Sequence, residues 1–186
     1  MRTFIAIFPP SKVREALLRE ARTLAARGNV RWSRPENVHL TLKFLGEVPE
    51  EDLDDVRDIL THVCARHEPF AAETSGYGAF PSAKRARVVW CGIGEGGGRL
   101  SLLAEDIERS LEDLGFARED RAYRPHITLG RARGHPASLE LPDDATSGLR
   151  FLVREVELVR SVLGEAGAAY STIAEYPLSE GGDQRP

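Results

Sequence analysis

The feature that most constrains the fold is a four-residue pattern that occurs twice. The segments 39–42 and 126–129 both read His, apolar, Thr, Leu. Side chains alternate between the two faces of a β-strand, so His and Thr point the same way while the apolar residues enter a core. Each pattern therefore predicts a strand with an imidazole and a hydroxyl on its open face. Two such strands could present His39 and His126 to one ligand.

Length and composition indicate one soluble globular unit. The chain has 186 residues, of which 41% are hydrophobic and 29% charged. No apolar run approaches the ~20 residues needed to span a bilayer, and the first eight residues lack the long apolar region of a signal peptide. Two cysteines, Cys64 and Cys91, give no disulfide framework. We expect a cytoplasmic protein that does not enter membranes and acts as a monomer.

The charges are unevenly distributed along the chain. The net charge is −4, which excludes a protein that binds long nucleic acids through its overall charge. A basic stretch nevertheless spans residues 121–133, with arginines at positions 121, 124, 131 and 133. A local basic site on an acidic body suits a short anionic ligand, such as one phosphate at the end of a nucleic acid.

The periodicity of apolar residues predicts alternating strands and helices. The strands are expected at 3–8, 31–32, 38–48, 70–80, 87–93, around His126, at 151–163 and at 168–176, and the helices at 11–27, 49–67 and 99–114. In each half, one helix precedes a His-x-Thr strand, which is compatible with duplication. We predict an α+β, bilobed fold with two antiparallel-rich sheets flanked by helices around a central cleft. It should form a single domain at 1–178, with 179–186 as a disordered tail.

Two other patterns predict no cofactor or metal site. Residues 92–97 match G-x-G-x-x-G between a strand and a helix, but the strand that follows carries His126 where a dinucleotide fold needs a parallel strand and its acid. We favour a Gly-rich surface loop. His62, Cys64 and His67 share a predicted helix at spacings that suit a metal poorly, so surface or half-buried positions are expected.

With their flanks, the paired motifs resemble a known family. The resembling segments are 2–7, 36–46, 78–81, 87–90, 123–129, 161–163 and Tyr170. Across nearly the whole chain the sequence is similar to the 2H phosphoesterases, specifically the bacterial and archaeal RNA 2′,3′-cyclic phosphodiesterases once called 2′-5′ RNA ligases. The resemblance implies a bilobed fold with the motifs facing each other, and metal-independent opening of RNA-terminal 2′,3′-cyclic phosphates. It also implies that His39 donates a proton, that His126 accepts one, and that the product is a 2′-phosphate.

The chemistry of the residues agrees with that function. Histidine, with a pKa of about 6.5, can act as acid or base near neutral pH, and the residues alone leave the order open. Thr41 and Thr128 can donate hydrogen bonds to phosphate oxygens. Arg131 matches the arginine that follows the second motif in the family and is the candidate phosphate ligand. A non-catalytic RNA-end or nucleotide-binding protein is the alternative, and reversible 2′-5′ RNA ligation in the same cleft is a possible side activity.

Strand parity bears on which cations can reach the cleft. Strict alternation places Arg131 on the buried face, unless Gly130 allows a bulge. The same alternation gives Lys43 and Arg124 the parity of the cleft face, although both could simply be solvated. Tyr123 could stack on a base, but packing in the core is the favoured interpretation.

Overall fold

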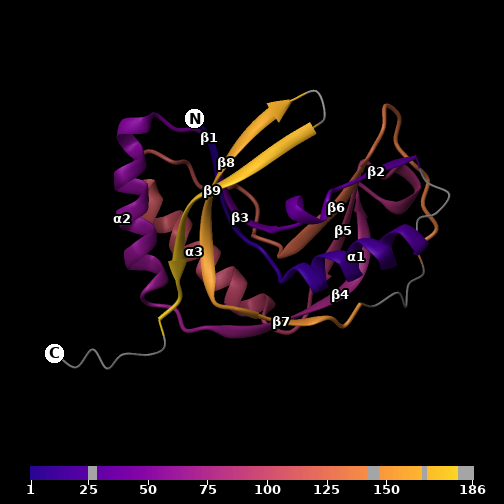
Figure 1. Cartoon of the computed structure of the whole chain (residues 1–186), viewed down its shortest axis with the longest axis horizontal. Helices are drawn as coiled ribbons and strands as arrows, with labels where there is room; N and C mark the ends of the chain where they lie inside the picture. The colour runs from indigo at the N-terminus through magenta and orange to yellow at the C-terminus, as the bar shows by residue number, and fades with distance from the viewer. Residues whose placement is uncertain (25–28, 142–146, 165–166, 180–186) are drawn as a thin grey trace.

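The computed structural model describes residues 1–24, 29–141, 147–164 and 167–179. This part of the chain contains three α-helices and nine strands. Figure 1 shows how they are arranged. The helices are α1 (Ser11–Leu24), α2 (Leu53–Cys64) and α3 (Gly97–Glu112). The strands are β1 (Arg2–Ile7), β2 (Val30–Trp32), β3 (Leu40–Glu47), β4 (Phe70–Phe80), β5 (Val88–Ile93), β6 (His126–Ala132), β7 (Arg150–Val153), β8 (Glu155–Gly164) and β9 (Gly167–Pro177). The α+β class predicted from the sequence is confirmed.

The strands form one curled sheet in which every pairing is antiparallel. Its order is β7-β4-β5-β6-β3-β1-β8-β9, with β2 added alongside β6. Two four-stranded halves, β9-β8-β1-β3 and β6-β5-β4-β7, meet where β3 lies against β6. That junction is a single residue pair, Leu40 with Ile127, which we call the central pair. The expected two antiparallel sheets are thus two halves that are continuous through one contact.

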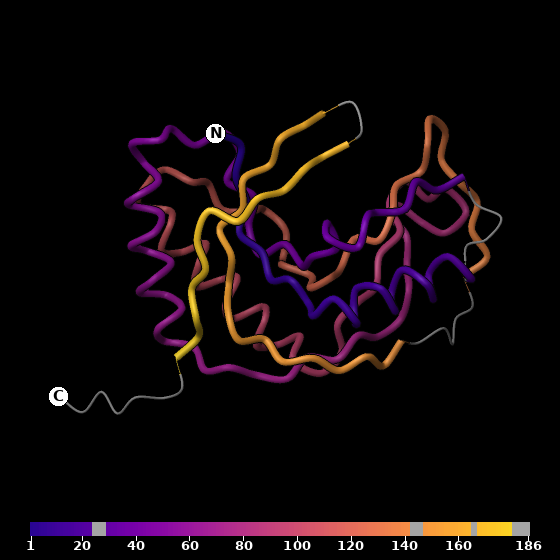
Figure 2. The backbone as a smooth tube through the Cα atoms, viewed as in Figure 1, coloured from indigo at the N-terminus to yellow at the C-terminus, as the bar shows by residue number. Residues whose placement is uncertain are grey.

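The helices α1 and α3 each pack against a strand of the half to which they do not lead in the sequence. α2 and α3 lie side by side at one end of the molecule (Figures 1 and 2). α2 packs against β8 and β9, and α3 packs against β3, whereas α1 packs against β6. Each helix that precedes a histidine strand in the sequence therefore supports the other histidine strand. This exchange ties the two halves together beyond the central pair.

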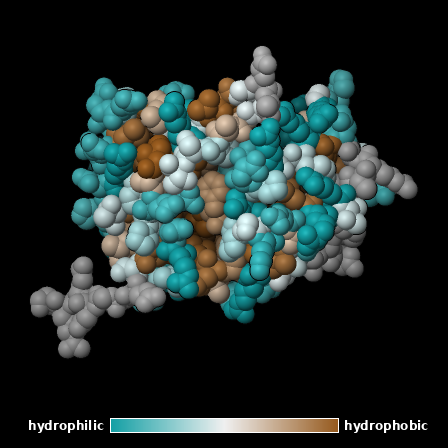
Figure 3. All heavy atoms as spheres, in the orientation of Figure 1, coloured by the Kyte–Doolittle hydropathy of each residue, from teal (hydrophilic) through white to brown (hydrophobic). Residues whose placement is uncertain are grey.

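Each helix buries one apolar stripe at the spacing predicted from the sequence. The buried members are Leu17 and Ala21 in α1, Leu53, Val56, Leu60 and Val63 in α2, and Leu100, Leu103, Ile107 and Leu111 in α3. Burying one such side chain contributes ~1.5–3 kcal/mol. On the face drawn in Figure 3, hydrophobic residues lie in scattered groups between polar ones. No described helix is long and apolar enough to cross a membrane.

One prediction about the strands is wrong, and one alternative is excluded. The strand expected at 151–163 is two strands, because Arg154 and Glu155 are both exposed and break the alternation. β7 then pairs with β4, while β8 pairs with β1 and β9. The dinucleotide-binding alternative is also excluded, because β5 runs antiparallel to its neighbours on both sides. The Gly-rich tract is a turn that leads into α3, with Gly96 in the left-handed region at φ 81°.

The expected boundaries at the chain end are only partly described. Of the predicted tail 179–186, only Ser179 lies within the described residues, and its N–H donates to the carbonyl of His67 at 2.9 Å. The end of the predicted helix 11–27 and part of the loop around 142–146 also lie outside them. A single domain at 1–178 stays a prediction.

Candidate active site

The central pair positions both His-x-Thr motifs. In an antiparallel pair, the residues that flank a paired position face each other across the strands. His39, immediately before β3, therefore lies beside Thr128 of β6. Thr41 lies beside His126 in the same way. All four are half-buried, whereas the apolar residues between and after them are buried, so the predicted alternation is confirmed over these motifs.

A β-bulge follows the motif in each strand. The register of β3 against β1 shifts at Leu42, and the register of β6 against β5 shifts at Leu129. One extra residue reverses the direction of the side chains that follow it. Lys43 therefore turns into the core and Phe44 turns to the open face. In β6 the same reversal returns Arg131 to the open face.

These bulges decide the two parity questions raised by the sequence. The bulge that Arg131 required is present beside Gly130. A Cβ at this glycine would lie 2.7 Å from Val30 Cγ1 and 3.0 Å from Trp32 Cε3, so glycine lets β2 approach β6 closely. The prediction that Lys43 has the parity of the cleft is wrong. Its side chain is buried, because the bulge in β3 turns it away.

Polar contacts fasten β3 to the segment that precedes β6. Lys43 Nζ donates to Glu108 Oε1 at 3.0 Å and to the carbonyl of Ala117 at 2.8 Å. The Tyr123 hydroxyl donates to the carbonyl of Thr41 at 2.8 Å, and burial raises the pKa of Tyr123. Tyr123 packs against the core, as favoured from the sequence. These contacts fix the two histidine strands relative to each other.

A cavity of about 820 Å³ opens on the polar face of the two strands. Four of the sequence-predicted site residues line it: His39, Thr41, Thr128 and Arg131. His126 is not among the lining residues. It lies beside the cavity, where it faces Thr41 across the central pair. The structure therefore brings the five predicted residues to one region of the sheet.

Arginines dominate the charge of the cavity wall. Arg2, Arg31, Arg34 and Arg131 line it, together with one acid among the described lining residues, Glu47. Of the four arginines in the basic stretch 121–133, only Arg131 lines the cavity. The other three cavity arginines were missed by sequence reasoning. Arg31 reaches the site through the pairing of β2 with β6, which places it directly opposite Arg131 and which the sequence pattern does not specify.

Aromatic rings surround His39. Its ring centroid lies 4.9 Å from that of Phe4, 5.4 Å from that of Phe8 and 5.3 Å from that of Tyr170. Burial, together with the nearby charges of Arg131 and His126, lowers the pKa of His39 to about 4, against the opposing effect of its hydrogen bond to Asn37. The imidazole of the free protein is therefore neutral at pH 7.

His126 has aromatic neighbours of its own. Its ring lies 5.5 Å from Phe80 and 6.4 Å from Trp90, both in edge-to-face orientation. Trp90 is only half-buried and contacts a predicted site residue. Both histidines thus stand against apolar rings, which restrict the orientation of each imidazole.

Each imidazole forms the same kind of hydrogen bond, from Nδ1 to the backbone carbonyl two residues before it in the sequence. His39 Nδ1 lies 2.8 Å from the carbonyl of Asn37, and His126 Nδ1 lies 2.8 Å from the carbonyl of Arg124. A carbonyl oxygen only accepts, so each Nδ1 carries the hydrogen and donates it. Nε2 is then the atom that each ring has available for proton transfer.

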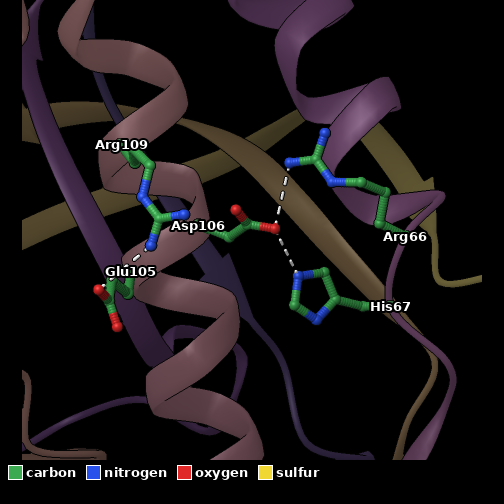
Figure 4. Close-up of polar contacts among 5 residues, drawn as sticks. All are labelled: Arg66, His67, Glu105, Asp106 and Arg109. Carbon is green, nitrogen blue, oxygen red and sulfur yellow. Dashed lines mark hydrogen bonds and ion pairs between the residues drawn. The ribbon is translucent and has the colours of Figure 1, made fainter.

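The remaining histidine cluster belongs to a different part of the molecule. Arg66 and His67 lie just after the C-terminal end of α2. Arg66 Nη2 and His67 Nε2 donate hydrogen bonds to Asp106 of α3 at 3.1 Å and 3.0 Å, as Figure 4 shows. Partial burial raises the pKa of Asp106, but the two hydrogen bonds outweigh it, so the pKa lies below its ordinary value. Cys64 is buried, not half-exposed. Among the described residues, no group of three or more His, Cys, Asp or Glu could hold a metal ion.

Comparison with known proteins agrees with this geometry. The family model for LigT-like phosphoesterases matches residues 7–90. An RNA 2′,3′-cyclic phosphodiesterase of Thermus thermophilus is 40% identical over 96% of this chain and 90% of its own length. A solved structure from Thermus thermophilus superimposes with a TM-score of 0.80, at 34% identity, over 97% of this chain and 100% of that one.

A ligand-bound structure is similar as well. The structure of E. coli LigT complexed with 3′-AMP has a TM-score of 0.77 and 26% identity, and the match covers 97% of this chain and 99% of that one. Sequence identity, coverage and fold point to the same group of enzymes. This chain therefore belongs to the LigT-like 2H phosphoesterases, in the family of the RNA 2′,3′-cyclic phosphodiesterases.

Proposed function

We propose that this chain hydrolyses 2′,3′-cyclic phosphates at RNA ends to 2′-phosphomonoesters, using His39 and His126 and no metal or other cofactor. The observation that carries the proposal is the central pair, which sets one His-Thr pair beside the other. The arginine-lined cavity on the same face supports an anionic substrate. The names of the relatives and the 3′-AMP bound by E. coli LigT support a nucleotide phosphate as that substrate.

The proposed reaction is one in-line displacement at phosphorus. His126 Nε2 accepts a proton from water as the water oxygen bonds to phosphorus. The bond from phosphorus to the 3′ oxygen breaks, and His39 Nε2 gives its proton to that leaving oxygen. Thr41 and Thr128 donate to the non-bridging oxygens, and Arg131 neutralises the charge that develops on them. With a 5′-hydroxyl in place of water, the same displacement would form a 2′-5′ linkage.

The pKa of His39 implies proton uptake when the anion binds. A proton donor must be protonated, yet the pKa of His39 lies at about 4 in the free protein. A bound phosphate attracts the imidazolium and raises this pKa. Between the free and the bound pKa values, binding therefore takes up a proton, and affinity rises as the pH falls. Calorimetry with adenosine 2′-phosphate in buffers of different ionisation enthalpy measures the protons taken up.

The matched variant for this measurement is His39→Gln. It keeps a polar side chain of similar size and cannot titrate, so it should lose the part of the uptake that belongs to His39. What remains comes from the phosphate and the other groups of the cavity. Equal proton uptake by the wild type and His39→Gln would contradict the proposed protonation of His39.

The decisive test of the function is hydrolysis of an oligonucleotide with a 2′,3′-cyclic phosphate end in the presence of EDTA. We expect turnover at an undiminished rate and a 2′-phosphate product, identified by chromatography against 2′- and 3′-phosphate standards. Binding without turnover would indicate an RNA-end binding protein. Loss of turnover in EDTA, with recovery on adding a divalent cation, would contradict the metal-independent mechanism.

A further inference from the structure

The carbonyl that holds His39 belongs to a short turn against which α1 packs. This turn is the 3₁₀ helix η1 (Pro35–Asn37). Its last residue, Asn37, supplies the carbonyl oxygen that accepts from His39 Nδ1 at 2.8 Å. Two backbone hydrogen bonds close the turn, donated by the N–H groups of Asn37 and Val38. A turn this short has few bonds of its own, so its position depends on the contacts that other elements make with it.

Arg14 of α1 makes the first of these contacts. Its Nη1 donates to the carbonyls of Pro35 and Glu36 at 3.2 and 3.3 Å. Its guanidinium carbon also lies 5.9 Å from the ring centroid of Phe8, and the Phe8 ring packs against His39. One side chain therefore contacts both the turn that carries the hydrogen-bond partner of His39 and a ring that packs on the same imidazole.

The side chain of Asn37 ties the turn to a second element, β9. Its Nδ2 donates to the carbonyl of Ala168 at 2.8 Å. Two residues further along β9, the ring of Tyr170 stands edge-on to His39, with the centroids 5.3 Å apart. The turn is thus held by α1 and by β9, and both elements also support a ring that packs on His39.

Arg14 lies outside the cavity in which the proposed reaction occurs. It is not among the residues that line the cavity of about 820 Å³, whereas His39 and Asn37 are. It lines a second, smaller cavity of about 230 Å³, on the other side of Tyr170. An effect of Arg14 on the reaction must therefore pass through the residues that it contacts.

We propose that Arg14 is a positioning residue for the proton donor: by holding η1, it fixes the Asn37 carbonyl and, through it, the orientation and the Nδ1–H tautomer of His39. Nε2 of the same ring is then kept available for the leaving oxygen. This inference rests on the proposed function, which makes His39 the donor. His126 donates to the carbonyl of Arg124, which is not part of η1. Arg14 should therefore affect the donor and leave the base unchanged.

Replacing Arg14 with methionine removes both hydrogen bonds and keeps a side chain of similar length. On an oligonucleotide that ends in a 2′,3′-cyclic phosphate, we expect kcat to fall about 10- to 100-fold, because a small displacement of a reacting group has effects of this size. KM should stay within about twofold, because Arg14 does not line the large cavity. Arg14→Lys keeps the charge and a donor on a flexible chain, and should recover part of the lost kcat.

The pH profile separates positioning from a general loss of structure. In the proposed reaction His39 must be protonated in the complex, so kcat falls as the pH rises through the pKa that His39 has there. The hydrogen bond to Asn37 raises the pKa of His39, because it favours the charged imidazole. A weaker bond lowers this pKa, so the alkaline limb of kcat should move to lower pH in Arg14→Met. Three further groups near His39 that titrate or carry charge stay in place: Tyr170, His126 and Arg131.

Nitrogen-15 NMR of the imidazoles tests the same contact without turnover. At pH 7 the neutral ring of His39 should carry its hydrogen on Nδ1 in the wild type and distribute it over both nitrogens in Arg14→Met. Asn37→Ala keeps the backbone carbonyl and removes only the amide bond to Ala168, so it should change the tautomer in the same direction. The resonances of His126 should stay as in the wild type in Arg14→Met.

Arg99→Met is the matched control. Arg99 of α3 also donates to a backbone carbonyl, that of Glu68 at 3.3 Å, and its guanidinium carbon lies 5.0 Å from the ring centroid of Phe70. It does not line the large cavity, so its kinetics and the His39 tautomer should match the wild type. An unchanged tautomer and alkaline limb in folded Arg14→Met would refute the inference while the proposed function stands. If the wild type does not hydrolyse the oligonucleotide, the proposed function fails, and the tautomer alone decides whether Arg14 holds the imidazole.

Discussion

Replacing either His39 or His126 with alanine is expected to lower kcat on a cyclic-phosphate end by about 10²–10⁴-fold each. Each imidazole is proposed to move one of two protons, and alanine can move neither. The two losses should not multiply in the double variant, because both groups act in the same step. Initial rates with an oligonucleotide substrate measure the effect. Circular dichroism establishes whether each variant remains folded.

His62→Ala is the control for these variants. His62 is an exposed histidine on α2, where its Nδ1 lies 2.7 Å from the carbonyl of Asp58. Its replacement removes the same side chain outside the cavity and should leave kcat unchanged. Because His39 packs against three aromatic rings, His39→Gln serves as a second variant with less loss of packing. A folded His39 or His126 variant with a near-wild-type rate would refute the mechanism.

Replacing Glu108 with alanine is expected to destabilise the fold by ~3–5 kcal/mol. Glu108 is the counter-ion of Lys43, which is only 4% exposed beneath β3. Removing one partner of a buried ion pair leaves the other charge uncompensated, and that accounts for most of the cost. For a domain of this size, the loss corresponds to a decrease in Tm of roughly 10 °C. Thermal and denaturant unfolding, followed by circular dichroism, measure both quantities.

Glu105→Ala on the same helix is the matched control. Glu105 pairs with Arg109 across an exposed surface, with 52% and 62% of the two side chains accessible (Figure 4). Such a pair contributes less than ~1 kcal/mol, so its loss should be small. Adding Lys43→Met to Glu108→Ala removes the orphaned charge and should recover part of the stability. Similar stability for Glu108→Ala and Glu105→Ala would mean that Lys43 does not depend on its partner.

The local parts of this site could be predicted from the sequence. The alternation of polar and apolar residues over 39–42 and 126–129 is a property of each strand alone, and the structure preserves it. The helical stripes follow from the same kind of local periodicity. Arg131 could be assigned to the phosphate site only through a bulge at Gly130, and the sequence itself suggests that condition because glycine is a residue at which strands bulge.

The features that were predicted wrongly or missed depend on how neighbouring strands pair. The bulge at Leu42 carries no sequence signal of its own, since it exists only in the register against β1, and it exchanges Lys43 for Phe44 on the open face. The three missed cavity arginines come from β1, β2 and the extended segment after β2. Their convergence requires the strand order, which periodicity does not specify. The break at Arg154 likewise follows from two different pairing partners, β4 and β1.

The single residue pair between β3 and β6 has a consequence for how the proposed chemistry is divided. Each half of the sheet supplies one imidazole and one hydroxyl, so neither half alone holds a full set of proton-transfer groups. The proposed reaction therefore requires both halves of the sheet. The geometry of its four groups is set by the contacts that hold β3 and β6 in place. The hydroxyl of Tyr123 and the ammonium of Lys43 form hydrogen bonds between β3 and the segment before β6. Neither residue lines the cavity.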